Sequence, residues 1–294
     1  MNIELFTNLY NELLSNLSSV QVSRIHSLVA VSYKQTVRVQ SYQDETLAKA
    51  FIELNESNDY HLLQTYKKLL IIGSILKNWP DLSAQSKGRL SVEYQVYLQR
   101  IYHLFINELD DSFDNMDIFW KELAVARLQL FPLRAGVAEF YSGFGIRQGL
   151  TFNLIETIRF IAYLLQSDFV RKAYYKVHTH TPTISNFSED GWTKSYLQLA
   201  EMLKRDKTIK GVIRGSWFFD PEIKKISPHL SYLQDLPLQH GAKLFYIGSD
   251  KSGCAFSKSK ARLKLYHDGK YTPKNYLLVW PREAIIHWAD SKIK

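Results

Sequence analysis

The chain has 294 residues, of which 46% are hydrophobic, 14% are aromatic and 22% are charged. This composition is typical of a globular protein with a large core and argues against disorder. The single cysteine, Cys254, excludes a disulfide framework within the chain and a zinc site built from cysteines.

The N-terminal segment and the apolar stretches indicate where in the cell the protein is expected to lie. The first helical segment carries Glu4 and Glu12 and lacks the basic residues that open a signal peptide. No uninterrupted apolar stretch approaches the roughly 20 residues that a membrane-spanning helix needs. The longest, residues 155–165, contains Arg159. We therefore predict a cytoplasmic protein with no membrane span.

Charge is divided unevenly along the chain. Residues 1–150 contain 14 Lys and Arg against 16 Asp and Glu, a net charge of −2. Residues 151–294 contain 23 against 13, a net charge of +10. A basic half suggests an anionic partner, such as nucleic acid, a nucleotide cofactor or coenzyme A. A lysine-rich surface that keeps the protein soluble would explain the same imbalance.

Helical spacing of apolar residues dominates the first part of the chain, beginning with Leu5, Leu9 and Leu13 on one face. Further helices are predicted over residues 44–54, 61–79, 91–105 and 117–130, and Pro80 and Pro132 mark the ends of the second and the last. The β-branched segment 20–39 fits a helix or a pair of strands, and its helical neighbours favour a helix. We predict a helical domain over residues 1–132.

The pattern changes after Pro132, where a glycine-rich stretch predicts a strand and a loop. Helices are predicted over residues 151–170, 192–204, 222–236 and 257–267. Extended segments are predicted over residues 174–184, 211–219 and 243–248, and over 275–288 as one or two strands with Pro281 between them. This alternation is typical of an α/β or α+β domain with a mixed sheet, which we predict over residues 133–294.

A histidine pair, His178 and His180, lies in the first extended segment. Residues two apart on a strand point to the same face, so both imidazoles would meet one ligand: a metal, a phosphate or a reacting proton. No third metal ligand follows at a recognisable spacing, and we predict no bound metal. The structural alternative is an edge strand whose imidazoles hydrogen-bond to loops.

The segment from Arg214 to Pro221 runs from a strand into a helix start. An arginine at a strand end suits a carboxylate or a phosphate. We predict that this segment lines a substrate pocket through Arg214, Ser216, Trp217 and Asp220. Asp220 also has a purely structural explanation, because Asp before Pro commonly caps a helix.

The basic segment 258–271 carries a recognisable pattern. It contains Ala261-Arg262, then Leu265-Tyr266, then Gly269 and Tyr271, and one or two predicted strands follow it. This pattern resembles the end of the fold of the GNAT family of N-acyltransferases, and the resemblance covers roughly the last 90 residues. It implies a GNAT-like fold there and, as acyl donor, acyl-CoA or another acyl carrier thioester.

The resemblance also implies roles for individual residues. In that family the tyrosine of the Leu-Tyr pair acts as general acid towards the departing coenzyme A thiolate, which assigns this role to Tyr266. We expect Lys260, Arg262 and Lys264 to hold the phosphates of the cofactor. We expect His178 or His180 to accept a proton from an amine. The glycine-rich pyrophosphate loop of the family has no counterpart after strand 211–219.

The predicted function is transfer of an acyl group from a coenzyme A or carrier thioester to an amine. Two alternatives stay open. One is a non-enzymatic binding module that uses the basic half for nucleic acid or an acidic partner. The other is a metal-dependent enzyme that uses His178 and His180. The sequence contains no nucleophile elbow, phosphate-binding P-loop or zinc-protease motif.

Overall fold

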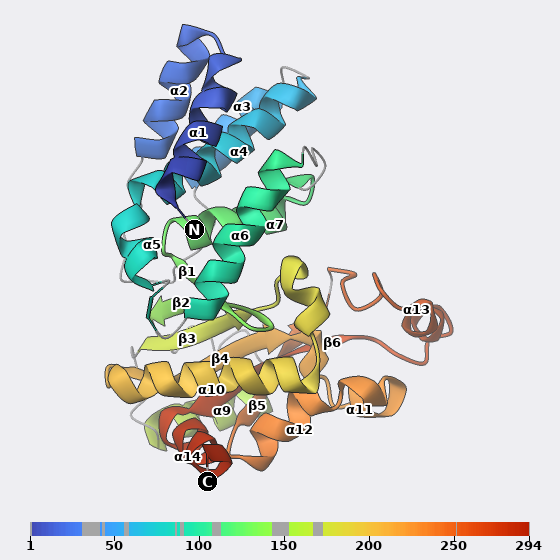
Figure 1. Cartoon of the computed structure of the whole chain (residues 1–294). Helices are drawn as coiled ribbons and strands as arrows, with labels where there is room; N and C mark the ends of the chain where they lie inside the picture. The colour runs from blue at the N-terminus through green and yellow to red at the C-terminus, as the bar shows by residue number, and fades with distance from the viewer. Residues whose placement is uncertain are drawn as a thin grey trace. The chain divides into compact units, whose positions relative to one another are not determined.

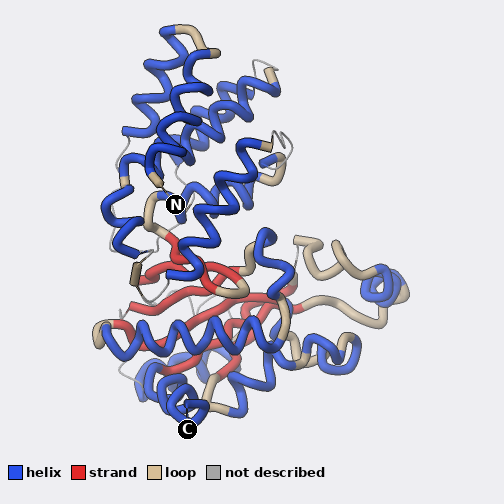
Figure 2. Tube along the Cα trace, viewed as in Figure 1, coloured by secondary structure: helices blue, strands red, loops and turns tan. Residues whose placement is uncertain are grey.

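The structure is a computed structural model of the chain, and it describes residues 2–30, 42, 45–55, 59–85, 87–88, 91–107, 113–142, 153–166, 173–250 and 252–293. Helices at the N-terminus are followed by a mixed α/β arrangement, which confirms the predicted fold class (Figures 1 and 2). Two compact units are present. The first contains Met1–Glu139 and Thr179–Ser185, and the second contains Phe140–His178 and Asn186–Lys294.

The first unit is built around one central helix. Its helices are α1 (Ile3–Ser15), α2 (Ser19–Ala30), α3 (Glu45–Asn55), α4 (Tyr60–Lys77), α5 (Trp79–Gln85), α6 (Ser91–Ile106) and α7 (Met116–Ala126). Helices α1, α2, α3 and α7 all pack against α4. Buried residues occur all round α4 between Gln64 and Ile75, as expected of a helix enclosed by others.

Two predicted helix ends in this unit were wrong. Pro80 does not end the long helix: α4 stops at Lys77, and Pro80 lies in the first turn of α5, where its missing N–H costs nothing. The helix predicted over 117–130 ends at Ala126, and Leu128 adopts a positive φ of 59°, which stops the helix. Residues Leu130–Leu133 then form β1, which pairs antiparallel with β2 (Gly136–Ser142).

The second unit contains the remaining elements. These are α9 (Leu154–Gln166), β3 (Ala173–His178), α10 (Glu189–Arg205), β4 (Ile209–Ser216), α11 (Ile223–Ile226), α12 (Tyr232–Gln239), β5 (Lys243–Ser249), α13 (Lys260–His267), β6 (Lys274–Pro281) and α14 (Arg282–Ile293), with 3-10 helices at Trp217–Phe219 and Pro228–Leu230. Another 3-10 helix, Thr181–Asn186, lies where the chain passes from one unit to the other.

The sheet of the second unit has the strand order β3-β4-β6-β5. Strands β3 and β4 are parallel, whereas β6 is antiparallel to both β4 and β5. On one face, Phe160 and Leu164 of α9 pack against Ile213 and Phe245. On the other face lie α10 and α14, which contact each other and β4 (Figure 1). Neighbouring residues of β4 therefore point towards different layers.

Three predictions in the second unit were corrected. The segment 275–288 is one strand and one helix, because Ile285, Trp288 and Ala289 have helical spacing and are buried. The extended segment 174–184 ends at His178 and is followed by the 3-10 helix Thr181–Asn186. Strand 211–219 ends at Ser216, whose hydroxyl accepts a hydrogen bond from the Phe218 N–H at 3.2 Å and so caps a 3-10 turn.

Several predictions fall wholly or partly outside the described residues. These are the second part of segment 20–39, most of the glycine-rich loop after residue 142 and the end of helix 151–170. Segment 20–39 is helical as far as Ala30. Among the described residues, no helix has both the length and the hydropathy to cross a membrane.

Candidate functional site

Arg214 is the residue about which the candidate site is built. Strand alternation directs Ile213 into the core beneath α9, so Arg214 lies on the face of α10. The Arg214 side chain is 2% exposed. Its guanidinium carbon lies 3.8 Å from the centre of the Trp192 ring and 5.3 Å from that of Phe219. The arginine is therefore enclosed by aromatic rings that attract its charge.

The Tyr196 hydroxyl is a side-chain partner of Arg214, and a hydrogen bond between the two contributes to the pKa of each. The indole nitrogen of Trp192 and both terminal nitrogens of Arg214 are buried, and none forms a hydrogen bond of standard geometry with a described residue. Burial raises the pKa of Tyr196, and the nearby Arg214 charge opposes this. Burial lowers the pKa of Arg214, although an arginine stays charged at neutral pH. Among the described residues, the cluster thus offers the N–H groups of Arg214 and Trp192 few acceptors beyond the Tyr196 hydroxyl.

The position of this cluster in the sheet is also informative. The parallel pairing of β3 with β4 extends from Ala173–Ile209 to Lys176–Ile213, and Arg214 is the next residue of β4. Both strands end nearby, at His178 and Ser216. In open α/β sheets, ligands bind beyond the carboxyl ends of parallel strands. Arg214 lies at that end of the pair.

Asp220 holds the turn that follows β4. One of its carboxylate oxygens accepts a hydrogen bond from the Glu222 N–H at 3.1 Å, and the other accepts one from the Lys274 N–H at 3.1 Å. Burial raises the pKa of Asp220, and these N–H groups oppose the shift. Gln234 donates to the carbonyls of Phe218 and Asp220 at 2.9 Å and 2.8 Å. These contacts support the structural explanation of Asp220 rather than substrate binding.

Trp217 joins β4 to the basic segment. Its side chain is 8% exposed and packs with Ile223, Ala255 and Tyr271. The Arg262 guanidinium carbon lies 4.8 Å from the centre of the Trp217 ring. Trp217 therefore anchors the segment that carries α13 and is not an open pocket wall.

Of the three residues predicted to bind the cofactor, Arg262 is already engaged. Its Nε donates to the Ala255 carbonyl at 2.7 Å and its Nη1 donates to the Ser227 hydroxyl at 2.9 Å. The side chain is buried. Lys260 and Lys264, by contrast, are exposed on α13. Only these two lysines remain available for phosphate.

Replacing Arg262 with methionine should loosen α13 without unfolding the sheet. A hydrogen bond from a charged group stabilises by about 1.5–3 kcal/mol, so losing two should lower amide-exchange protection in α13 by about 100-fold or more. Hydrogen exchange read by mass spectrometry measures this. The control is Lys260→Met, since Lys260 is exposed on the same helix. Equal protection in both variants would contradict the anchoring role of Arg262.

The three predicted catalytic residues occupy different surroundings. Tyr266 is 46% exposed, and its ring centre lies 4.8 Å from that of Phe256. His178 ends β3 and is half-buried. His180 belongs to the first unit, where its Nε2 lies 2.9 Å from a Glu122 carboxylate oxygen. The prediction that both imidazoles share a strand face was wrong, because β3 ends at His178.

Glu122 is the centre of that buried contact. Glu122 is fully buried. The Arg100 Nη2 lies 2.6 Å from the Glu122 Oε1, the same oxygen that His180 contacts. Burial alone would raise the pKa of Glu122, but the charges of Arg100 and His180 outweigh burial and hold it below its ordinary value. His180 is thus part of a buried ionic cluster and not an exposed base.

Comparisons with protein-family models, with curated proteins and with solved structures gave no match. Nor do the described residues contain a group of three or more His, Cys, Asp or Glu side chains placed to hold a metal ion.

Sequence reasoning missed Trp192 and Tyr196. Both lie on α10 and are buried, although most of that helix is polar. A signal was present, because two large aromatic residues four apart share one helix face. Nothing local indicated that this face would meet an arginine on a strand.

Proposed function

We propose that the second unit binds the anionic part of an acyl thioester carrier at Arg214 and transfers the acyl group to an amine. The observation that supports binding is the buried guanidinium of Arg214, which has no carboxylate partner and whose two terminal nitrogens form no hydrogen bond of standard geometry within the described part of the chain. The GNAT-like pattern around Tyr266 supports the choice of an acyl carrier.

Energetics favour an anionic occupant. Burying an ion without a partner costs several kcal/mol, and the aromatic rings around Arg214 offset only part of this cost. A carboxylate or phosphate would accept two parallel hydrogen bonds from the guanidinium fork. The Tyr196 hydroxyl and the Trp192 N–H are further donors for the remaining oxygens.

The transfer step assigns a role to each remaining predicted residue. The amine nitrogen forms a bond to the thioester carbonyl carbon, and the carbon–sulfur bond then breaks. His178 accepts the proton that the amine loses, and Tyr266 donates a proton to the departing thiolate. Lys260 and Lys264 contribute positive charge for the phosphates of the carrier.

Calorimetric titration with acetyl-CoA, coenzyme A and inorganic phosphate tests the binding step. Acetyl-CoA should bind, and Arg214→Met should weaken binding by about 100-fold or more, since it removes two charge-assisted hydrogen bonds worth about 1.5–3 kcal/mol each. Arg159→Met is the matched control, because the Arg159 side chain is 58% exposed on α9. Arg214→Lys keeps the charge without the fork and should bind with intermediate affinity.

The outcomes separate the parts of the proposal. No binding of either coenzyme A compound to the folded protein would rule out the acyl carrier. Equal binding by wild type and Arg214→Met would rule out Arg214 as the anchor. Release of free thiol from acetyl-CoA, measured with a thiol reagent, tests the acyl-transfer step. Tyr266→Phe should slow this release while leaving the affinity for acetyl-CoA unchanged.

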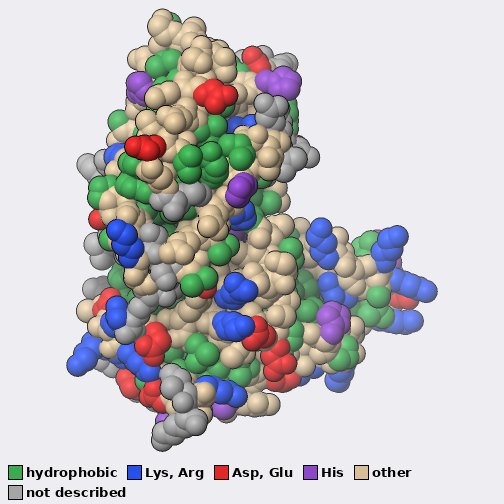
Figure 3. Space-filling model, in the orientation of Figure 1, with side chains coloured by type: hydrophobic (Ala, Val, Ile, Leu, Met, Phe, Trp, Pro, Cys, Tyr) green, Lys and Arg blue, Asp and Glu red, His purple; other side chains and the backbone are tan. Residues whose placement is uncertain are grey.

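A second candidate function rests on the surface of α13. Lys260 and Lys264 are exposed there, Lys258 is exposed just before the helix, and Tyr266 and Leu263 are 46% and 37% exposed. Lys and Arg side chains gather at this part of the molecule (Figure 3). Basic side chains interleaved with an exposed aromatic ring suit single-stranded nucleic acid, through phosphate contacts and base stacking.

Salt dependence distinguishes this candidate from the first. Binding of a single-stranded oligonucleotide should weaken steeply as salt rises, and replacing Lys258, Lys260 and Lys264 with glutamine should reduce the slope. Arg214→Met should leave oligonucleotide binding unchanged. An affinity that is the same at low and high salt would contradict nucleic-acid binding.

A further inference from the structure

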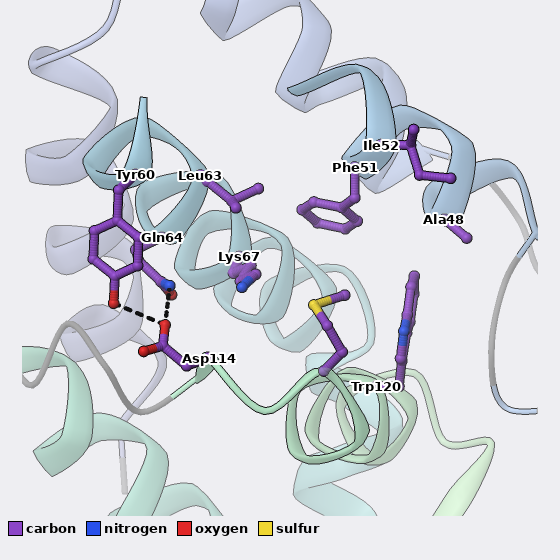
Figure 4. Close-up of a pocket in the computed structure, with 10 residues that line it drawn as sticks. Ala48, Phe51, Ile52, Tyr60, Leu63, Gln64, Lys67, Asp114 and Trp120 are labelled. Atoms are coloured by element: carbon purple, nitrogen blue, oxygen red, sulfur yellow. Dashed lines mark hydrogen bonds between the residues drawn. The ribbon is translucent and has the colours of Figure 1, made fainter. Parts of the chain in front are cut away.

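A pocket in the first unit lies between α3, α4 and the start of α7, far in sequence from the residues of the proposed acyl-transfer site. Its volume is about 480 Å³, within the range of small-molecule sites. Figure 4 shows Phe51, Ile52 and Trp120 on one side and Gln64 and Asp114 on the other. The pocket therefore has an apolar side and a polar side.

The orientation of the Gln64 amide on the polar side follows from its partner. Asp114 accepts hydrogen bonds on one carboxylate oxygen from the Tyr60 hydroxyl at 2.8 Å and from the Gln64 Nε2 at 2.9 Å (Figure 4). An ionised carboxylate only accepts, so the NH₂ of Gln64 must face it. The Gln64 side-chain oxygen is buried and has no hydrogen-bond partner among the described residues. Gln64 is 1% exposed, so bulk water does not supply that donor.

Lys67 lies one helical turn after Gln64 and also lines the pocket. It is 2% exposed, donates to the Phe113 carbonyl at 2.9 Å, and its nitrogen is 6.0 Å from the Phe119 ring centre. An ammonium group has three N–H donors, so Lys67 retains donors beyond this bond. The polar side thus offers a buried donor and a buried, unpaired acceptor.

We infer that this pocket binds a small, mostly apolar molecule through a neutral hydroxyl group. The hydroxyl accepts a hydrogen bond from Lys67 and donates one to the Gln64 oxygen, while the apolar body packs against Phe51, Ile52 and Trp120. A carboxylate on the ligand would leave the Gln64 oxygen without a donor and would face Asp114. An ammonium on the ligand would face Lys67. A hydroxyl avoids both repulsions, because it carries no charge and can both donate and accept.

Three probes of similar shape test this inference: 4-butylphenol, 4-butylbenzoate and butylbenzene, titrated into the full chain by calorimetry. 4-Butylphenol should bind about tenfold or more tightly than butylbenzene, because leaving buried polar groups unpaired costs about 1–3 kcal/mol. It should also bind more tightly than 4-butylbenzoate. Gln64→Leu should remove the preference for the phenol over butylbenzene.

A second variant, which fills the pocket, gives a test that does not depend on the folding of Gln64→Leu. Ile52 is 62% exposed, so Ile52→Trp should fold and should abolish binding of all three probes. Val20→Trp is the control, since Val20 is 77% exposed on α2 and does not line this pocket. The inference is overturned if the phenol and butylbenzene bind wild type equally, if the benzoate binds most tightly, if no probe binds, or if Ile52→Trp binds like wild type.

Discussion

Replacing Glu122 with alanine should lower the free energy of unfolding by about 3–5 kcal/mol, because removing one partner of a buried ionic cluster leaves uncompensated charge. Glu122 is fully buried on α7 and contacts Arg100 and His180 through the same carboxylate oxygen. Glu122→Gln keeps the size and one acceptor, so it should be destabilised less. Chemical denaturation, followed by circular dichroism, measures both losses.

The matched control is Glu283→Ala. The Glu283 side chain is 88% exposed, and the nearest Arg282 nitrogen is 3.7 Å away. Surface substitutions of this kind change stability by roughly 0.5 kcal/mol or less. A loss for Glu122→Ala no larger than that for Glu283→Ala would contradict the buried cluster.

The same cluster gives stability a defined dependence on pH. Arg100 and His180 hold the pKa of Glu122 below its ordinary value of 4.5, against the raising effect of burial. A carboxyl group with a lowered pKa in the folded state contributes its full stability above the unfolded value. That contribution is lost as the pH falls from about 4.5 towards the folded pKa. Glu122→Gln should lack this component of acid sensitivity, as measured by denaturation at pH values between about 5 and 3.

Replacing Gly211 with alanine should destabilise the second unit by about 3 kcal/mol or more, since backbone strain and steric overlap each cost roughly 1–3 kcal/mol. Gly211 in β4 has a φ of +151°, a backbone conformation that residues other than glycine rarely adopt. A Cβ at this position would lie 2.3 Å from the Trp280 carbonyl oxygen. The overlap is with backbone of the paired strand β6, so it cannot be relieved by a rotamer change. Thermal and chemical denaturation measure the loss.

Gly215→Ala on the same strand is the control. Its Cβ would lie 3.7 Å from the Ile247 Cδ1, an ordinary contact distance. Because alanine restricts the unfolded chain more than glycine, this variant should keep wild-type stability to within about 1 kcal/mol. Similar losses for both variants would contradict the argument from the Gly211 backbone.

Much of the fold was predictable because its signals are local. The helical spacing of apolar residues predicted α1, α3, α4, α6, α10 and α13. Runs of β-branched and aromatic residues predicted β4, β5 and most of β6. Two of the errors occurred at prolines, which can either end one element or lie at the start of the next. Pro80 opens α5 instead of only ending α4, and Pro281 ends β6 immediately before α14. Proline geometry allows both placements. The packing of the neighbouring apolar residues therefore determines which of the two occurs.

The candidate site was predictable only in part. Arg214 was identified because a strand-end arginine suits an anion, and it remains the residue on which the proposed function rests. Ser216, Trp217 and Arg262 had equally suggestive sequences, yet each makes structural contacts in the fold. A residue type indicates which partners a side chain can have. Whether a neighbour has already supplied that partner depends on contacts between distant segments.

By itself the sequence determined the helical first part, the mixed α/β second part and the excess of positive charge in the latter, because these depend on composition and on periodicity over a few residues. Only the tertiary structure decided that His180 contacts Glu122, 58 residues away, and that Arg214 lies buried against Trp192. Burial and pairing of charge are set by which distant segments pack together, and local sequence patterns carry little information about that packing.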